Sequence, residues 1–165
     1  RLLRMLDAMP HGVLAMSRDV PGLVETSSNL AVVATAGSSA RVVTSQRSSV
    51  MASLYAAQRQ AVSVFELAGA SVSSNDPYPG WKPNPESAIV RKAVAVYREL
   101  FGSEPAVKAI HAGLECGLLL EKIPGMDAVS IGPEIHGAHS PEEKVQISSV
   151  QKFYRHTAAI LKDLA

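Results

Sequence analysis

Side chains with the chemistry to bind metal or substrate gather in one stretch of the chain, residues 107–145. This stretch holds three of the five histidines, His111, His136 and His139, together with the only cysteine, Cys116. Neutral imidazole is a common zinc ligand at about 2.0–2.1 Å, but a single histidine does not complete a metal site. A two-metal centre needs several further ligands, mostly carboxylates. The pattern therefore indicates part of a metal site with His139 as the candidate ligand, or else an ordinary loop histidine.

The residues that follow His139 predict a rigid turn behind it. Ser140 and Glu143 fit a capping box, and Pro141 falls at the first helical position. A helical turn that begins here would fix the backbone of His139. Glu142 and Glu143 would then lie in the first turn, where carboxylates complement the helix dipole. We therefore expect this glutamate pair to stabilise the start of the helix.

The surrounding elements predict a parallel strand, helix, strand unit. Apolar runs at residues 107–110 and 128–131 predict two buried strands, and residues 114–122 between them predict a helix. Parallel sheets place their working residues on the loops beyond the carboxyl ends of the strands. Both His111 and the loop of residues 132–139 fall at such positions.

Two long motifs in this stretch resemble those of a known family. HAGLECG at residues 111–117, followed by IGPEIHGAHSPEEKV at residues 131–145, resembles the C-terminal part of the Xaa-His dipeptidases, the bacterial carnosinase-like aminoacyl-histidine dipeptidases. Shorter matches extend the resemblance over nearly the whole chain: HGVLAMS at 11–17, VETSSNLAVV at 24–33 and YPGWKP at 78–83. Members of this family are co-catalytic zinc peptidases with a catalytic domain and an inserted lid or dimerisation domain.

The resemblance implies an α/β fold in two parts. Residues 1–76 would be the C-terminal part of an α+β lid, and residues 77–165 the C-terminal part of a catalytic domain with a mixed or parallel sheet. The chain starts at Arg1, without a methionine and inside a helical pattern, so we expect it to be the tail of a longer protein.

Within the lid part, the spacing of apolar residues predicts the elements directly. The β-branched runs at residues 29–36 and 40–46 predict a hairpin, and residues 48–68 predict an amphipathic helix. Residues 70–74 predict a further short strand.

The resemblance also assigns roles to single residues. His139 would bind one zinc ion, and Arg47, at the exit of a strand, would bind the C-terminal carboxylate of the substrate through the two prongs of its guanidinium, unless it is a solvated surface arginine. Gly113 would present its backbone to the substrate, where no side chain fits. Two assignments stay open. Glu115 either meets the free amino group of the substrate or caps its own helix, and His111 either contacts the substrate or supports its loop.

For the intact enzyme, the resemblance implies hydrolysis of Xaa-His dipeptides with two zinc ions as the cofactor, and a homodimer or self-association through exposed sheet edges. No residue of this chain is assigned as catalytic, because the family's general base and its other metal ligands find no match here. We therefore expect this segment alone to be inactive. The alternatives are another metallo-aminopeptidase or tripeptidase of the same clan, or a non-catalytic dimerisation module.

Composition excludes several other classes of function. Of the 165 residues, 47% are hydrophobic and 5% aromatic, which describes a globular protein packed by aliphatic side chains. The net charge of +1 provides no basic surface for nucleic acid, and no apolar run approaches the roughly 18 residues of a membrane span. A single cysteine gives no internal disulfide framework and suits a reducing compartment. We expect a cytoplasmic protein whose partner is a dipeptide rather than nucleic acid or a membrane.

Overall fold

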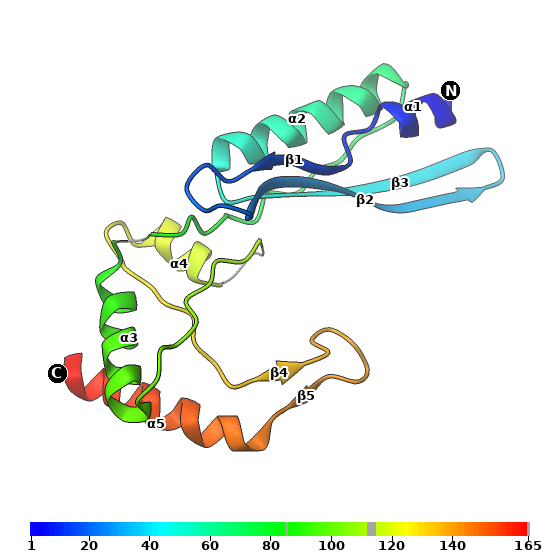
Figure 1. Cartoon of the computed structure of the whole chain (residues 1–165). Coiled ribbons are helices and arrows are strands. Elements are labelled where there is room, and N and C mark those ends of the chain that lie inside the picture. The colour runs from blue at the N-terminus through cyan, green and yellow to red at the C-terminus, as the bar shows by residue number, and fades with distance from the viewer. Residues whose placement is uncertain (85, 112–114, 165) are drawn as a thin grey trace. The chain divides into compact units, whose positions relative to one another are not determined.

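The computed structural model describes residues 1–84, 86–111 and 115–164 (Figure 1). The chain divides into two compact units. Unit 1 comprises Arg1–Pro83 and Ala109–Ile123, and unit 2 comprises Asn84–Lys108 and Pro124–Ala165. The boundary between lid and catalytic domain expected at residues 76 and 77 concerns a longer protein and stays a prediction.

Unit 1 is built on an antiparallel sheet of three strands in the order β1, β2, β3. The strands are β1 (Gly12–Met16), β2 (Val24–Ala36) and β3 (Ser39–Ser48). The hairpin predicted at residues 29–46 is therefore confirmed. Its turn contains Gly37 at φ 58°, a left-handed conformation that glycine adopts without steric cost.

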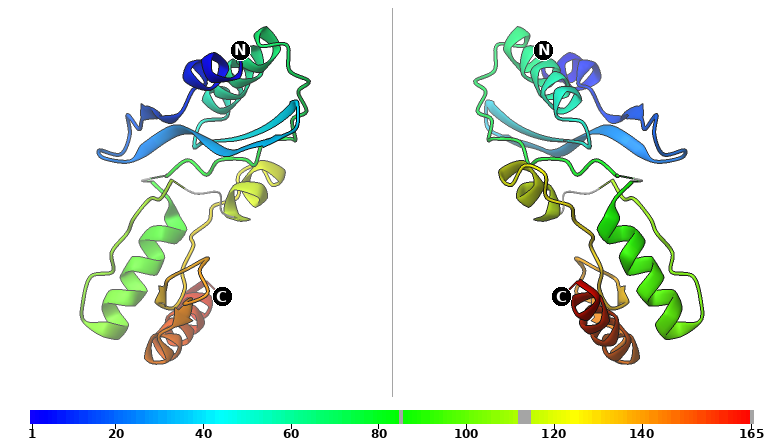
Figure 2. Two further views of the ribbon diagram at one scale, coloured as in Figure 1. Left: turned by 90° about the vertical axis from the view of Figure 1, so that its right-hand side faces the viewer. Right: turned by 90° about the vertical axis from the view of Figure 1, so that its left-hand side faces the viewer.

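Three helices accompany this sheet: α1 (Leu2–Ala8), α2 (Met51–Leu67) and α4 (Glu115–Lys122). Helices α1 and α2 lie on one side of the sheet, and α4 lies toward the other side (Figures 1 and 2). Helix α2 buries Leu54, Ala57 and Ala61, and small side chains of this kind let a helix lie close to its sheet. The predicted helices at residues 48–68 and 114–122 are confirmed as α2 and α4.

Unit 2 is a pair of helices with a small hairpin. Helices α3 (Ala88–Phe101) and α5 (Ile147–Leu164) pack through Ala93, Val96 and Ile160, and the hairpin consists of β4 (Ile135–His136) and β5 (Lys144–Val145). A buried histidine strengthens the helix pair, because His156 Nε2 on α5 lies 2.8 Å from the backbone carbonyl oxygen of Ala93 on α3. None of the helices in the described part of the chain combines the length and the apolar character that a membrane span requires.

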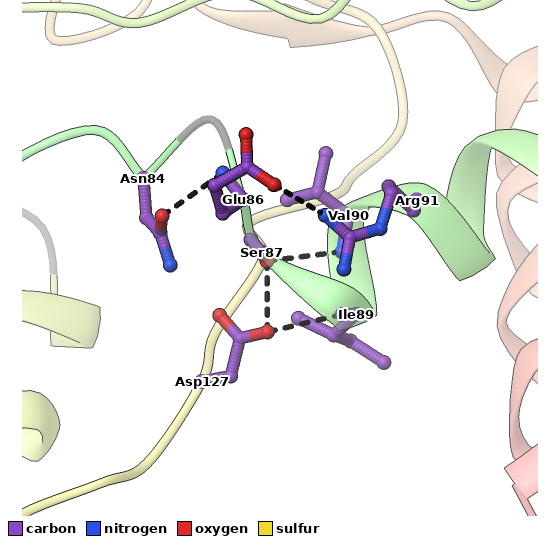
Figure 3. Close-up of polar contacts among 7 residues, drawn as sticks. All are labelled: Asn84, Glu86, Ser87, Ile89, Val90, Arg91 and Asp127. Carbon is purple, nitrogen blue, oxygen red and sulfur yellow. Dashed lines mark hydrogen bonds and ion pairs between the residues drawn. The ribbon is translucent and has the colours of Figure 1, made fainter.

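The start of α3 is held by a carboxylate from a distant part of the chain (Figure 3). Ser87 is the N-cap: its hydroxyl oxygen accepts a hydrogen bond from Val90 N at 3.1 Å and its proton is donated to Asp127 Oδ2 at 2.9 Å. The same Asp127 oxygen accepts from Ile89 N at 3.0 Å. These hydrogen bonds, led by the one from Ile89, hold the pKa of Asp127 below its ordinary value. The capping network thus fixes residue 127 against the helix start.

The predicted parallel strand, helix, strand unit is wrong for the described residues. Neither residues 107–110 nor residues 128–131 form a strand, and both sheets found in the described part of the chain are antiparallel. A strand needs a neighbouring strand for its backbone hydrogen bonds, and these runs have none there. The side chains of Val107 and Ile110 are accordingly 64% and 59% exposed, so the apolar run that predicted burial is not buried in this chain.

The strand predicted at residues 70–74 is also wrong. These residues are exposed and pair with no strand of the described sheet, whose third strand ends at Ser48. Gly69, at φ 75°, ends the α2 region, and the chain then continues as an irregular segment.

Candidate functional site

Three polar side chains of unit 1 lie together on one face of the sheet. Arg47, near the end of β3, is paired directly with Ser27 of β2. Residues that oppose one another across an antiparallel pair project from the same face. From outside the sheet, His111 Nε2 approaches Ser27 Oγ to 2.7 Å. The structure thus brings Arg47 and His111, two residues singled out in the sequence, to the same place.

The opposite face at this point of the sheet is closed by its own hydrogen bonds. Thr26 and Ser48 are buried, and their hydroxyl oxygens lie 2.8 Å apart. Ser28, also buried, accepts a hydrogen bond from Gln46 Nε2 at 3.1 Å. Because successive residues of a strand alternate between faces, this arrangement leaves Ser27 and Arg47 on the other face, where Arg47 is exposed.

The surroundings of His111 favour the uncharged imidazole. Burial lowers the pKa of His111, and the positive charge of Arg47 lowers it further, while a hydrogen bond with the backbone carbonyl of Val24 acts in the opposite direction. Nε2 lies 2.7 Å from Ser27 Oγ, so this ring nitrogen has its partner within the chain.

Helix α4 is seated by two close backbone approaches. At Gly117, a Cβ atom would lie 2.8 Å from the carbonyl oxygen of Pro79. At Gly80, a Cβ atom would overlap the carbonyl oxygen of Ser48, at the end of β3. The segment at residues 79–80 therefore lies directly between α4 and the strand that carries Arg47, and only glycine permits this spacing.

This packing locates Glu115, and it shows what the YPGWKP motif does locally. Glu115 is the first residue of α4 and is exposed. Its helix is held against residues 79–80, which in turn lie against Ser48, the neighbour of Arg47. Gly113 lies outside the described residues. Of the substrate-binding residues expected from the sequence, Arg47, His111 and Glu115 thus belong to one unit.

His139 belongs to unit 2, in the loop that joins β4 to β5. Its φ of 66° makes it the non-glycine residue with positive φ in the described part of the chain. Its backbone N–H donates to Glu143 Oε2 at 2.6 Å, and Ser140 N donates to the carbonyl of Gly137 at 3.1 Å. A left-handed backbone in a histidine is uncommon and persists only where the neighbouring structure holds it.

The helical turn predicted after Ser140 is wrong, although its glutamate behaves partly as expected. Residues 140–142 form a turn, and β5 begins at Lys144, so no helix dipole is present for Glu142 and Glu143 to complement. Glu143 does reach back to a backbone N–H as in a capping box, but to that of His139 rather than that of Ser140. The fixed backbone of His139 therefore comes from the tight turn of a hairpin.

The donor set of the described residues does not by itself fit a metal ion. They contain no group of three or more histidine, cysteine, aspartate or glutamate side chains placed to hold one. His139 is exposed, and Cys116 is a half-buried free thiol within α4. A zinc site needs at least three protein ligands, so within this part of the chain His139 remains a single candidate ligand.

Comparisons with known proteins agree over almost the whole chain. The sequence model described as peptidase family M20/M25/M40 matches residues 8–163. The chain is 38% identical over 162 residues to the cytosol non-specific dipeptidase of Escherichia coli (strain K12). This alignment covers 98% of this chain and 33% of that protein. Among solved structures, the aminoacylhistidine dipeptidase from Vibrio alginolyticus matches with a TM-score of 0.81 and 41% identity, over 98% of this chain and 33% of that one.

A more distant structure shares the fold. The aminopeptidase PepT from Bacillus cereus ATCC 10987 matches with a TM-score of 0.77 at 19% identity, over 96% of this chain and 43% of that one. At this identity the likeness concerns the fold alone. The chain spans about a third of the length of each of the two more similar relatives.

Proposed function

The chain belongs to peptidase family M20/M25/M40, and we propose that it is a segment of a dipeptidase that hydrolyses Xaa-His dipeptides. One observation carries the proposal: 98% of the chain aligns with each of two proteins named as dipeptidases, at 38% and 41% identity. Peptidases of this family are generally metal-dependent. The activity belongs to a longer protein, because the chain corresponds to about a third of either relative.

In this proposal Arg47 binds the C-terminal carboxylate of the dipeptide. Its exposure at the end of β3 supports this role, because the guanidinium is free to meet a ligand on that face. Each charged hydrogen bond in such a pair contributes about 1.5–3 kcal/mol, and a guanidinium makes two in parallel. Glu115, exposed at the start of α4, is assigned to the free amino group of the substrate, and the backbone of Gly113 to the peptide itself.

The proposed cofactor is a pair of zinc ions, to which this chain contributes His139. The left-handed backbone of His139 and its hydrogen bond to Glu143 support the assignment, because a ligand held in one orientation loses little freedom when a metal binds. The described residues do not complete the site, so we propose that the 165-residue chain alone hydrolyses no dipeptide and binds zinc weakly.

A broader dipeptidase is the second candidate. The relative from Escherichia coli carries the name of a non-specific dipeptidase, and its identity to this chain is similar to that of the aminoacylhistidine dipeptidase. The remaining alternatives are a tripeptidase of the same clan and a non-catalytic dimerisation module. For the whole protein we propose a cytoplasmic location and a homodimer that pairs through open sheet edges. Strand β1 offers such an edge, with Val13 and Met16 exposed.

The test is a substrate profile of the full-length protein. We expect hydrolysis of β-alanyl-histidine and other Xaa-His dipeptides, loss of turnover on chelation and recovery with zinc. A kcat/KM about tenfold higher for Xaa-His than for other dipeptides would support the narrow activity. Equal values across C-terminal residues would favour the non-specific dipeptidase, and cleavage of tripeptides alone would overturn both. The isolated chain, loaded with excess zinc, serves as the inactive control, and turnover by it would contradict the assignment of an incomplete site.

A further inference from the structure

Ser27 lies at the centre of the polar face of unit 1, the face of the sheet that carries Arg47 and meets His111. It is the residue of β2 directly opposite Arg47 of β3. Opposed residues of an antiparallel pair have Cβ atoms about 4.5–5.5 Å apart, so the serine hydroxyl lies at the base of the arginine side chain. Ser27 is half-buried, whereas Arg47 is exposed.

Among the described residues, the hydroxyl of Ser27 pairs with the imidazole of His111. Ser27 Oγ lies 2.7 Å from His111 Nε2, although the two residues are 84 positions apart in the sequence. The ring is half-buried and lies close to the backbone of Val24, the first residue of the same strand. With Nε2 engaged by Ser27, this ring nitrogen is not available to a substrate.

We propose that Ser27 is a positioning residue: its hydroxyl holds the imidazole of His111 against β2, beside Arg47, so that the ring limits the directions in which the guanidinium can point. The proposal rests on the proposed function, in that Arg47 is taken to bind the substrate carboxylate. It also decides between the two roles open for His111, which supports the site and does not itself contact the substrate.

Electrostatics agree with this geometry. An imidazolium beside Arg47 would repel the guanidinium, and the charge of Arg47 lowers the pKa of His111, as burial also does. The neutral ring can therefore pack beside the guanidinium at neutral pH without repelling it. A long arginine side chain loses rotamer freedom when it binds, and a neighbour that restricts it in advance reduces that loss.

The experiment compares Ser27→Ala, Ser27→Thr and Ser45→Ala in the full-length enzyme, with a dipeptide and its C-terminal amide as substrates. Ser45, exposed on β3 opposite Asn29, is the matched control. We expect Ser27→Ala to raise KM for the dipeptide by about fivefold, the scale of one neutral hydrogen bond, with kcat changed less than about twofold. The amide should be unaffected, and Ser27→Thr, which keeps the hydroxyl, should restore KM.

Two further measurements separate positioning from general support of the fold. In an Arg47→Ala background, Ser27→Ala should cause no additional loss, because the residue that it positions is absent. By NMR titration, Ser27→Ala should raise the pKa of His111 toward its ordinary value, since the ring becomes more hydrated.

The outcomes distinguish a failure of the role of Arg47 from a failure of the role of Ser27. If Arg47→Ala weakens the dipeptide and the amide equally, the carboxylate role of Arg47 fails, and with it the proposed function of this face. If Arg47→Ala acts on the dipeptide alone but Ser27→Ala leaves KM unchanged, or weakens both substrates equally, then only the role of Ser27 is overturned.

Discussion

The polar face of unit 1 and the loop that carries His139 hold their side chains in different ways. On the first, Ser27 and His111 meet across 84 residues of sequence, and glycines at 80 and 117 allow backbones from three segments to touch. In the second, the hydrogen bond from His139 N–H goes to a residue four positions away, Glu143. One arrangement depends on tertiary packing and the other on a short hairpin, so changes that disturb the fold should affect the first more than the second.

The largest effect is expected when the side chain of His139 is replaced. We predict that His139→Asn in the full-length protein lowers kcat/KM by at least about 100-fold and removes one of two bound zinc ions, since a lost ligand costs more than the 10–100-fold of a supporting residue. Asparagine tolerates a positive φ, so the loss would not come from backbone strain. The measurements are metal content and steady-state kinetics.

His136→Asn is the control for this experiment, because His136 is exposed in the same hairpin. It should keep both metals and near-normal turnover. Retention of two tightly bound zinc ions by His139→Asn would make His139 an ordinary loop residue.

The next largest effect is expected at the polar face of unit 1. Arg47→Lys should reduce kcat/KM for a dipeptide by about 10–100-fold, because an ammonium cannot reproduce the two parallel hydrogen bonds of a guanidinium. The C-terminal amide of the same dipeptide should lose much less, since it lacks the carboxylate. Kinetics on both substrates check this, and an equal loss on both would mean that Arg47 serves only the stability of the sheet.

The sequence predicted these two regions to different extents, because some of their interactions join residues close in the sequence and others join residues far apart. The hairpin of β2 and β3 and the helices α2 and α4 were predicted correctly, because turn residues and apolar periodicity are local signals. The hydrogen bond from a backbone N–H to Glu143 was likewise predicted from local sequence, and only the predicted helical turn that should contain it was wrong. Its partner is one residue earlier than a capping box requires, and the chain enters β5 instead.

The signals that failed were those that needed a distant partner. Ser27 lies in the run of residues 26–28, Thr-Ser-Ser, where nothing in the residue types shows which hydroxyl will face an imidazole. Knowing the strand register would have helped, because Ser27 alternates with the buried Thr26 and Ser28. The apolar runs at 107–110 and 128–131 failed for the same reason, since an apolar run becomes a strand only beside another strand.

A smaller effect, on stability, is expected at the close backbone approaches next to the polar face of unit 1. Gly80→Ala should destabilise the protein by about 1–3 kcal/mol, because the new methyl overlaps the backbone of Ser48 and the chain must shift. The free energy of unfolding, measured with urea, checks this. Gly132→Ala is the control, because a Cβ atom there meets nothing within 4 Å and its φ is not in the left-handed region. Equal stability of the two variants would mean that residues 79–80 are not tightly packed against β3.

A comparable change tests the local arrangement. Glu143→Ala should weaken zinc binding to the full-length protein by about tenfold, the lower end of what supporting residues contribute, because the backbone of His139 loses its acceptor. Competition with a chelator gives the affinity. The free energy of unfolding of the metal-free protein should change little, in contrast to Gly80→Ala. A large loss of stability in this variant would show that the loop, like the sheet face, depends on the wider fold.

The smallest effect is expected at the capping network of α3, which combines a local cap, Ser87, with a distant one, Asp127 (Figure 3). The pKa of Asp127 lies below its ordinary value of 3.8, so its carboxylate stabilises the fold fully above that pH and loses its contribution as the pH falls through the lower, folded-state pKa. Asp127→Asn should therefore be less stable than the parent protein at about pH 7, and the difference should shrink in acid. Urea unfolding across this range measures the difference, with Asp7→Asn as a control for the loss of an exposed carboxylate without these hydrogen bonds. A difference that stayed constant with pH would show that shape, and not charge, holds residue 127 against the helix start.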